Sequence, residues 1–186
     1  MSAQEDKTRQ TNGELPYRQI PDYPDSYTAE NVAARVIDGL GYRYYWATEG
    51  LTENDLDYRP PNDGRSTLET IDHILGLTYT IVNASLNQAN VSREKLDLTF
   101  EQKRRMTLEN IQNASQVLKE RNANTMNDLK VIFKRGENTN EFPYWNMING
   151  PILDAVYHTG QVVAFRRSSG NPINPNVRVF LGKTTE

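Results

Sequence analysis

The chain has 186 residues, of which 37% are hydrophobic and 24% are charged, and its formal net charge is −3. This length suffices for one domain with a sizeable core, while the acidic balance argues against a nucleic-acid-binding surface. The absence of cysteine excludes disulfides, thiolate nucleophiles and cysteine-ligated zinc. No apolar run approaches the roughly 20 residues that span a bilayer, and residues 1–14 hold no apolar signal segment, so we expect a cytoplasmic protein that binds no membrane.

The first 26 residues are polar and contain Pro16, Pro21 and Pro24, which predicts a flexible start followed by an extended arm. Tyr17, Ile20 and Tyr23 are candidates for pinning this arm onto the rest of the chain. We expect residues 27–186 to form a single domain. Its first helix is predicted over residues 27–49, where apolar residues recur at helical spacing, and Gly50 provides a stop.

A second helix is predicted over residues 66–86, opened by a capping box in which Ser66 is followed three residues later by Glu69. Its apolar residues fall on two arcs of the helix: Leu68, Ile71, Leu75, Val82 and Leu86 on one, and Ile74, Leu77 and Ile81 on the other. A helix that is apolar over so much of its circumference is central or buried at a partner interface, so we expect a homodimer. His73 falls at the edge of the second arc, about 40° from Leu77.

A further capping box at Thr99 and Gln102 opens a third helix, which ends near Asn122. The stretch 129–142 predicts a short hairpin or an irregular excursion, and a fourth helix follows over residues 144–169. That helix either begins or kinks at Gly150-Pro151, because proline disrupts a helix interior. Four long helices without a long strand pattern predict an all-α protein, a four-helix bundle with an excursion between its third and fourth helices.

The last of these helices carries a pair that could perform chemistry. Asp154 and His158 are four residues apart and therefore share one helix face with the apolar residues Val162 and Phe165. If His73 faces this pair, two imidazoles and one carboxylate make a divalent metal site with positions open to water or substrate. The alternatives are a hydrogen-bonded core histidine and a simple intrahelical ion pair.

Several neighbours of this pair have two readings. Gln161 could support the metal ligands or only pack between helices, and Tyr157 could line a pocket, although packing is the simpler role. Arg166 and Arg167 could bind an anionic substrate, although a solvated face near the end of the helix is the simpler reading. No residue stands out as a separate general base.

Two stretches of the chain resemble the DinB-like family of four-helix bundles. "GLTENDLDYRPPNDGRSTLETIDHILGL" is similar to the family's loop, capped helix and first histidine, and "INGPILDAVYHTGQVVAFRRSSGNP" is similar to its last helix. The resemblance covers about residues 28–183. It implies that His73, Asp154 and His158 bind a divalent metal, nickel or zinc, with Asp154 standing where many members carry histidine. Carboxylate is an acceptable ligand for such an ion.

The resemblance also implies a reaction class. Members are similar to thiol-dependent S-transferases that use low-molecular-weight thiols, or to hydrolases, so we expect a metal-dependent enzyme acting on a small molecule. The rival hypothesis is a non-catalytic, dimeric stress-response or binding module that retains the helices. The substrate, the choice of metal and any catalytic residue besides the ligands are left open by the sequence.

Overall fold

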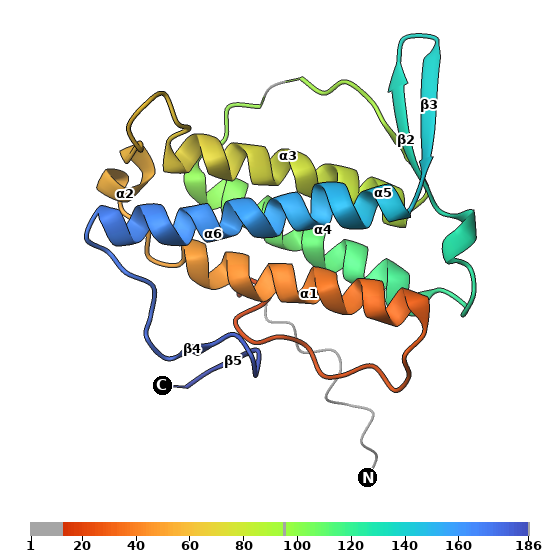
Figure 1. Ribbon diagram of the computed structural model, residues 1–186, viewed down its shortest axis with the longest axis horizontal. Helices are drawn as coiled ribbons and strands as arrows, with labels where there is room; N and C mark the ends of the chain where they lie inside the picture. Colours follow the sequence, from red (N-terminus) through yellow and green to blue (C-terminus); the bar gives the residue numbers. More distant parts are fainter. Residues whose placement is uncertain (1–12, 95, 186) are drawn as a thin grey trace.

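The computed structural model describes residues 13–94 and 96–185 of the chain. Within them, the long helices lie side by side along the molecule (Figure 1): α1 (Ala29–Thr48), α3 (Thr67–Ser85), α4 (Phe100–Glu120) and α6 (Leu153–Ser168). Helices α1 and α3 each pack against both α4 and α6, so the apolar faces of all these helices meet in one core. None of the helices in the described residues is both long and apolar enough to cross a membrane.

Side-chain caps fix where three of these helices begin. Thr28 accepts a hydrogen bond from the Asn31 amide at the start of α1. Ser66 and Thr99 head capping boxes that their third helical residues, Glu69 and Gln102, close. Such caps satisfy amide groups that have no partner inside the helix. Both boxes predicted from the sequence are therefore confirmed.

Helices α3 and α4 run in the same direction, although they follow one another in the chain (Figure 1). The connection between them, residues 86–99, returns along the length of α3 before α4 begins. A simple up-and-down order of helices is therefore absent. The returning segment lies over the face of α3 that is turned away from the core.

The prediction of an all-α four-helix bundle is wrong, because the described residues form two small sheets and additional short helices. The hairpin within 129–142 is present, with β2 (Lys130–Arg135) antiparallel to β3 (Asn138–Pro143). Strand β1 (Ala89–Asn90) adds to β2 in parallel, across 43 residues of chain, and this pairing has no local sequence signal. A second sheet joins β4 (Val177–Arg178) to β5 (Lys183–Thr184). The fold is mixed α/β, and it also contains α2 (Glu53–Asp57) and a 3₁₀ turn (Met126–Asp128).

The last long helix is entered through a wide turn. The short α5 (Trp145–Met147) leads into a π-helical segment, Ile148–Ile152, and then into α6. Gly150 departs from helical dihedral angles there, with φ −100° and ψ −106°. Because Pro151 cannot donate an amide hydrogen bond and its ring crowds the preceding turn, an ordinary α-helix would be disrupted at this point. The chain is therefore kinked at Gly150, ahead of Pro151, which is one of the two outcomes that the sequence left open.

The N-terminal arm and the C-terminal tail are held together beneath α1 (Figure 1). The Tyr17 hydroxyl donates to the buried carboxylate of Asp38 at 2.9 Å, and the Ile20 amide donates to the carbonyl of Gly182 at 2.9 Å. Tyr17 and Ile20 thus pin the arm as predicted, while Tyr23 stays 78% exposed. Residues 1–12 of the expected flexible start lie outside the described residues.

Arg166 is buried, so the expectation that it belongs to a solvated face is wrong. Its guanidinium donates to the carbonyl oxygens of Trp46, Ala47 and Glu49, at 3.0 to 3.1 Å. These are carbonyls at the end of α1, which a helix leaves without partners of its own. Arg167, the next residue, is exposed.

Candidate metal centre

His73 on α3 meets Asp154 and His158 on α6. Nε2 of His73 lies 3.2 Å from Oδ2 of Asp154, and Nε2 of His158 lies 3.3 Å from Oδ1 of the same carboxylate. The imidazole rings of His73 and His158 stand edge to face, with centroids 4.5 Å apart. One donor atom from each of the three residues lies within 4.8 Å of the others, and in the described part of the chain no other such group of three was found.

Helical spacing and helix packing together produce this cluster. Asp154 and His158 are one turn apart on α6, which places them on one face. Helix α3 packs against α6, and His73 lies at the border between its buried and its exposed faces. The three donor groups therefore converge at the junction of the two helices.

The cluster lies at the rim of this junction and not in the core, which corrects the expectation of an inward-facing site. The side chain of Asp154 is 42% exposed and that of His73 is 31% exposed, while that of His158 is 11% exposed. Val162, one turn beyond His158, is fully buried and begins the core proper. One side of the cluster is thus open to solvent and the other is closed by protein.

Gln161 contacts the ring nitrogen of His158 that faces away from Asp154. Its amide oxygen lies 2.7 Å from Nδ1 of His158. Because an amide oxygen only accepts hydrogen bonds, this contact favours the tautomer in which Nδ1 is the donor and Nε2 presents a lone pair toward Asp154. A lone pair and a carboxylate oxygen 3.3 Å apart repel unless a cation lies between them. A metal ion between the two atoms removes this repulsion, as does the other tautomer of His158 with the Gln161 amide turned over.

The spacing of the donor atoms fits a divalent ion. Bonds of about 2.1 Å in a tetrahedral arrangement place neighbouring ligand atoms about 3.4 Å apart. The two separations that involve Asp154, 3.2 and 3.3 Å, are close to this value but belong to different oxygens of the carboxylate, and one donor atom from each of the three residues lies within 4.8 Å of the others. Two imidazoles and one carboxylate form a donor set that zinc and nickel accept, with at least one position left open on the solvent side.

The structure assigns different positions to the two other candidate residues near the cluster, Gln161 and Tyr157. Gln161 makes the supporting contact that the sequence had left open, and its spacing of three residues from His158 is the signal that could have selected it. Tyr157 is 65% exposed, with its ring centroid 5.3 Å from that of His158. It is therefore not a core residue and borders the open side of the cluster.

Comparison of the chain with protein-family models, with curated proteins and with solved structures gives no match. The site is therefore described by its geometry alone. It is a rim-exposed cluster of two histidines and one aspartate, built on two packed helices. The resemblance to the DinB-like family remains a prediction.

Proposed function

We propose that His73, Asp154 and His158 bind a divalent metal ion, nickel or zinc, and that the protein is a metal-dependent enzyme acting on a small molecule. The observation that carries this proposal is the carboxylate of Asp154, which faces a different imidazole with each of its oxygens. The DinB-like resemblance supplies the reaction class, a thiol-dependent S-transfer or a hydrolysis. The cytoplasm is part of the same proposal.

In this proposal the metal and the side chains around it have different roles. The metal, when bound, lowers the pKa of a coordinated thiol or water, so that a nucleophile forms near neutral pH. Asp154 supplies the negative charge that attracts the cation, and Gln161 keeps the proton of His158 away from the donor nitrogen. Since the chain has no cysteine, the sulfur of an S-transfer reaction comes from a small thiol that enters on the exposed side.

Metal content tests the proposal directly. In untagged protein, we expect plasma spectrometry to find one ion per chain in the wild type and a loss of most of it in Asp154→Ala and His158→Ala. Asp72→Ala is a matched control. The side chain of Asp72, on α3, is 44% exposed, much like that of Asp154, but it pairs with Lys103 outside the cluster. This variant should keep its metal.

Three further outcomes bear on the proposal. Acidification should release the ion, because imidazole nitrogens must be deprotonated to ligate. Wild-type protein that binds no nickel or zinc, even after reconstitution at about pH 7.5, would exclude the site. Metal-loaded protein without activity on a broad panel of thiol-transfer and hydrolysis substrates would instead favour the second candidate.

That second candidate is a non-catalytic, dimeric binding module. The sequence predicted a dimer from the apolar surface of α3. That surface is buried against other parts of the same chain, since Ile71, Ile74 and Ile81 are fully buried. Exposed apolar side chains occur elsewhere: Val36, Leu153 and Phe180 line one shallow cavity of about 350 Å³ between α1, α6 and the tail. This surface favours a second copy as partner, which light scattering on the purified chain would detect.

A further inference from the structure

A cavity of about 1460 Å³ lies on the outer face of α3, on the side away from the core. It is bounded by α3, by the segment that returns over it and by the β2–β3 hairpin. Its lining includes Leu75, Tyr79, Arg93, Leu96, Leu98 and Phe133. The metal-binding candidates do not line it, although His73 lies on α3 between the lining residues Asp72 and Leu75.

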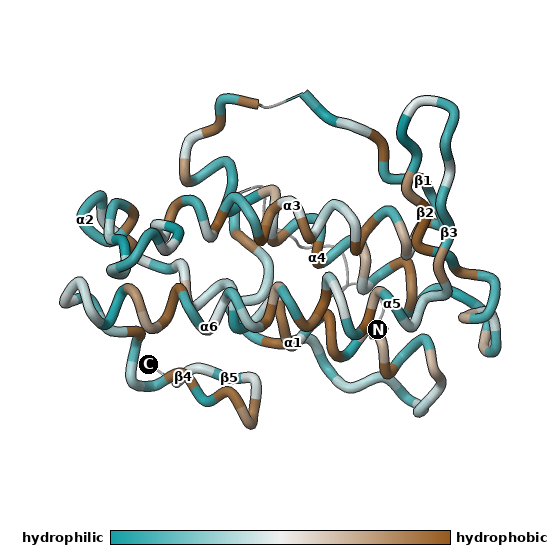
Figure 2. The backbone as a smooth tube through the Cα atoms, turned by 45° about the horizontal axis from the view of Figure 1, so that its top comes forward, coloured by the Kyte–Doolittle hydropathy of each residue, from teal (hydrophilic) through white to brown (hydrophobic). Residues whose placement is uncertain are grey.

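The floor of this cavity is apolar. Leu75 is 7% exposed, and Leu98 and Phe133 are half-buried; of these side chains, Phe133 packs against the main core. Val91 and Leu96, in the returning segment, are 55% and 56% exposed although both border the cavity. Figure 2 shows the brown, apolar stretches of that segment. An apolar body in the cavity would remove these side chains from water.

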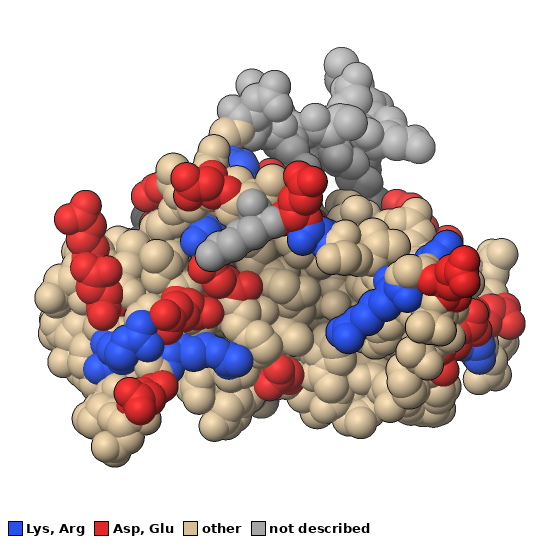
Figure 3. All heavy atoms as spheres, turned by 90° about the horizontal axis from the view of Figure 1, so that it is seen from above, with Lys and Arg blue, Asp and Glu red and all other residues tan. Residues whose placement is uncertain are grey.

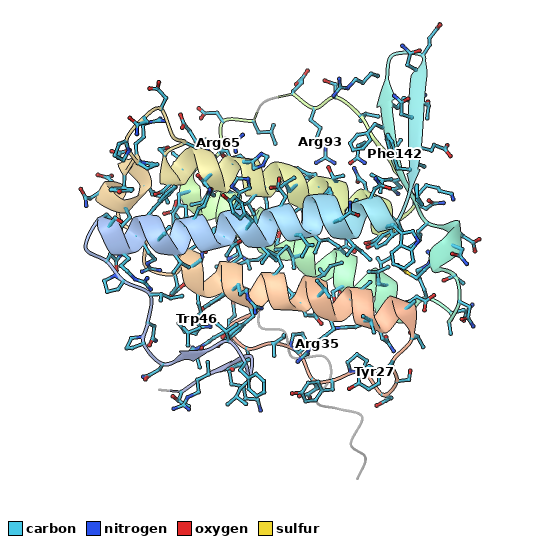
Figure 4. All side chains as sticks on the ribbon, in the orientation of Figure 1. Tyr27, Arg35, Trp46, Arg65, Arg93 and Phe142 are labelled. Carbon is cyan, nitrogen blue, oxygen red and sulfur yellow. The ribbon has the colours of Figure 1, made fainter. Side chains whose placement is uncertain are left out.

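Four basic residues line the cavity, together with the acidic residues Asp72 and Glu94. Arg93 points from the returning segment toward α3 (Figure 4), and its guanidinium carbon lies 3.5 Å from the centre of the Tyr79 ring. Lys134 and Arg135 reach the cavity from β2. Within residues 13–94 and 96–185, none of these cations has a carboxylate partner, whereas Lys103 is neutralised by Asp72 at 2.8 Å. Figure 3 looks down on this face and shows basic side chains interspersed with acidic ones around uncharged surface.

We infer that this cavity binds an elongated small molecule with one carboxylate head and an apolar body. An arginine fork matches a carboxylate with two parallel hydrogen bonds, and stacking on Tyr79 holds the Arg93 guanidinium in place before the ligand arrives. The lining residues of α3 run from Asp72 to Thr80, about 12 Å at 1.5 Å per residue. A straight acyl chain of medium length fits that span, with its head at Arg93 and its body over Leu75 and Leu98.

This inference is independent of the proposed function, because the cavity needs no metal. Decanoate is the probe, titrated calorimetrically into the purified full chain below the concentration at which the acid self-associates. We expect saturable binding at one site, unchanged by a chelator. Arg93→Gln should weaken binding about tenfold, the effect of losing one charge-assisted contact. Arg178→Gln, which changes an exposed arginine on the opposite side of the molecule, should leave it unchanged.

The ligand can be varied in the same way. Decanol lacks the charge and acetate lacks the apolar body, so both should bind at least about tenfold more weakly than decanoate. Leu96→Asn should weaken the binding of decanoate but not the binding of acetate. Four results overturn the inference: no saturable binding, equal binding of decanol and decanoate, an Arg93→Gln variant that binds as the wild type does, or loss of binding with chelator, which would place the carboxylate on a metal.

Discussion

Asp154 uses both of its carboxylate oxygens, one toward each histidine. A histidine in its place would offer a single donor nitrogen and could not face both rings at once. The carboxylate also brings a negative charge to a cluster whose other members are imidazoles, which strengthens its attraction for a divalent cation. The predicted resemblance to the DinB-like family places the histidine of many members at this position, and contact with both rings is what a histidine here would lack.

Gln161 should matter for metal affinity although it is not a ligand. Gln161→Leu removes the acceptor that holds the proton on Nδ1 of His158, so the ring can turn or change tautomer. We expect the dissociation constant for metal to rise about tenfold to a hundredfold, measured by competition with a chromophoric chelator.

Gln161→Glu keeps an acceptor oxygen at the same distance and should bind metal as tightly as the wild type or more tightly. Circular dichroism of both variants shows whether the helices are intact. Equal affinity in the leucine variant would mean that the contact with His158 has no part in binding.

At the scale of elements, the end of α1 is stabilised by cations from other helices. Its last turn contains no basic residue, and the chain leaves it at Glu49 in an extended conformation. Arg166 of α6 donates to its final carbonyls, and Arg104 of α4 donates to the Tyr45 carbonyl and pairs with Glu49. Burial lowers the pKa of Arg166, while nearby Asp55 and Glu49 act in the opposite direction. The two arginines tie three helices together at one point.

Replacing Arg166 with methionine should therefore be costly. The change keeps much of the apolar stem but leaves buried carbonyls without donors, and we expect the free energy of unfolding to fall by about 2 to 4 kcal/mol. Arg167→Met is the matched control, since that side chain is exposed, and it should change the value by less than about 0.5 kcal/mol. Urea denaturation of both variants gives the comparison, and similar values for the two would contradict the capping role.

At the scale of the whole molecule, the arm and the tail depend on one another through Gly182. Its φ is +65°, and a Cβ atom there would lie 2.0 Å from Cγ2 of Ile20. Gly136, in the turn of the β2–β3 hairpin, has a similar φ of +60° but no atom within 4 Å of such a Cβ. Substitution of Gly136 by alanine thus introduces backbone strain alone, whereas substitution of Gly182 introduces backbone strain and a steric conflict with Ile20.

Gly136→Ala should cost about 1 kcal/mol, because alanine disfavours the left-handed conformation. Gly182→Ala should cost more and should also free the Ile20 amide, whose hydrogen bond to the Gly182 carbonyl closes the contact. Hydrogen exchange at Ile20 tests this, alongside urea denaturation. Equal stability losses with unchanged exchange would show that the tail does not hold the arm.

The parts of this structure that local spacing determines were predictable. The capping boxes at Ser66 and Thr99, the shared face of Asp154 and His158, and the hairpin within 129–142 each depend on residues a few positions apart. The parallel pairing of β1 with β2 depends on residues far apart in the chain, and so does the burial of Arg166 beneath the end of α1. Periodicity also failed to place the cluster at the rim, because exposure depends on what the neighbouring helices cover.

A one-residue deletion inside Ile148–Ile152 would mainly rotate α6 relative to the preceding segment, and would shorten the chain only slightly. The wide turn there holds one residue more than an α-helical turn does, and removing one residue would turn one side of it by about 100° relative to the other. Asp154 and His158 would swing away from His73, or else Trp145 and the hairpin before it would lose their place. In this part of the chain the number of residues, more than their chemical nature, sets the direction in which the cluster points.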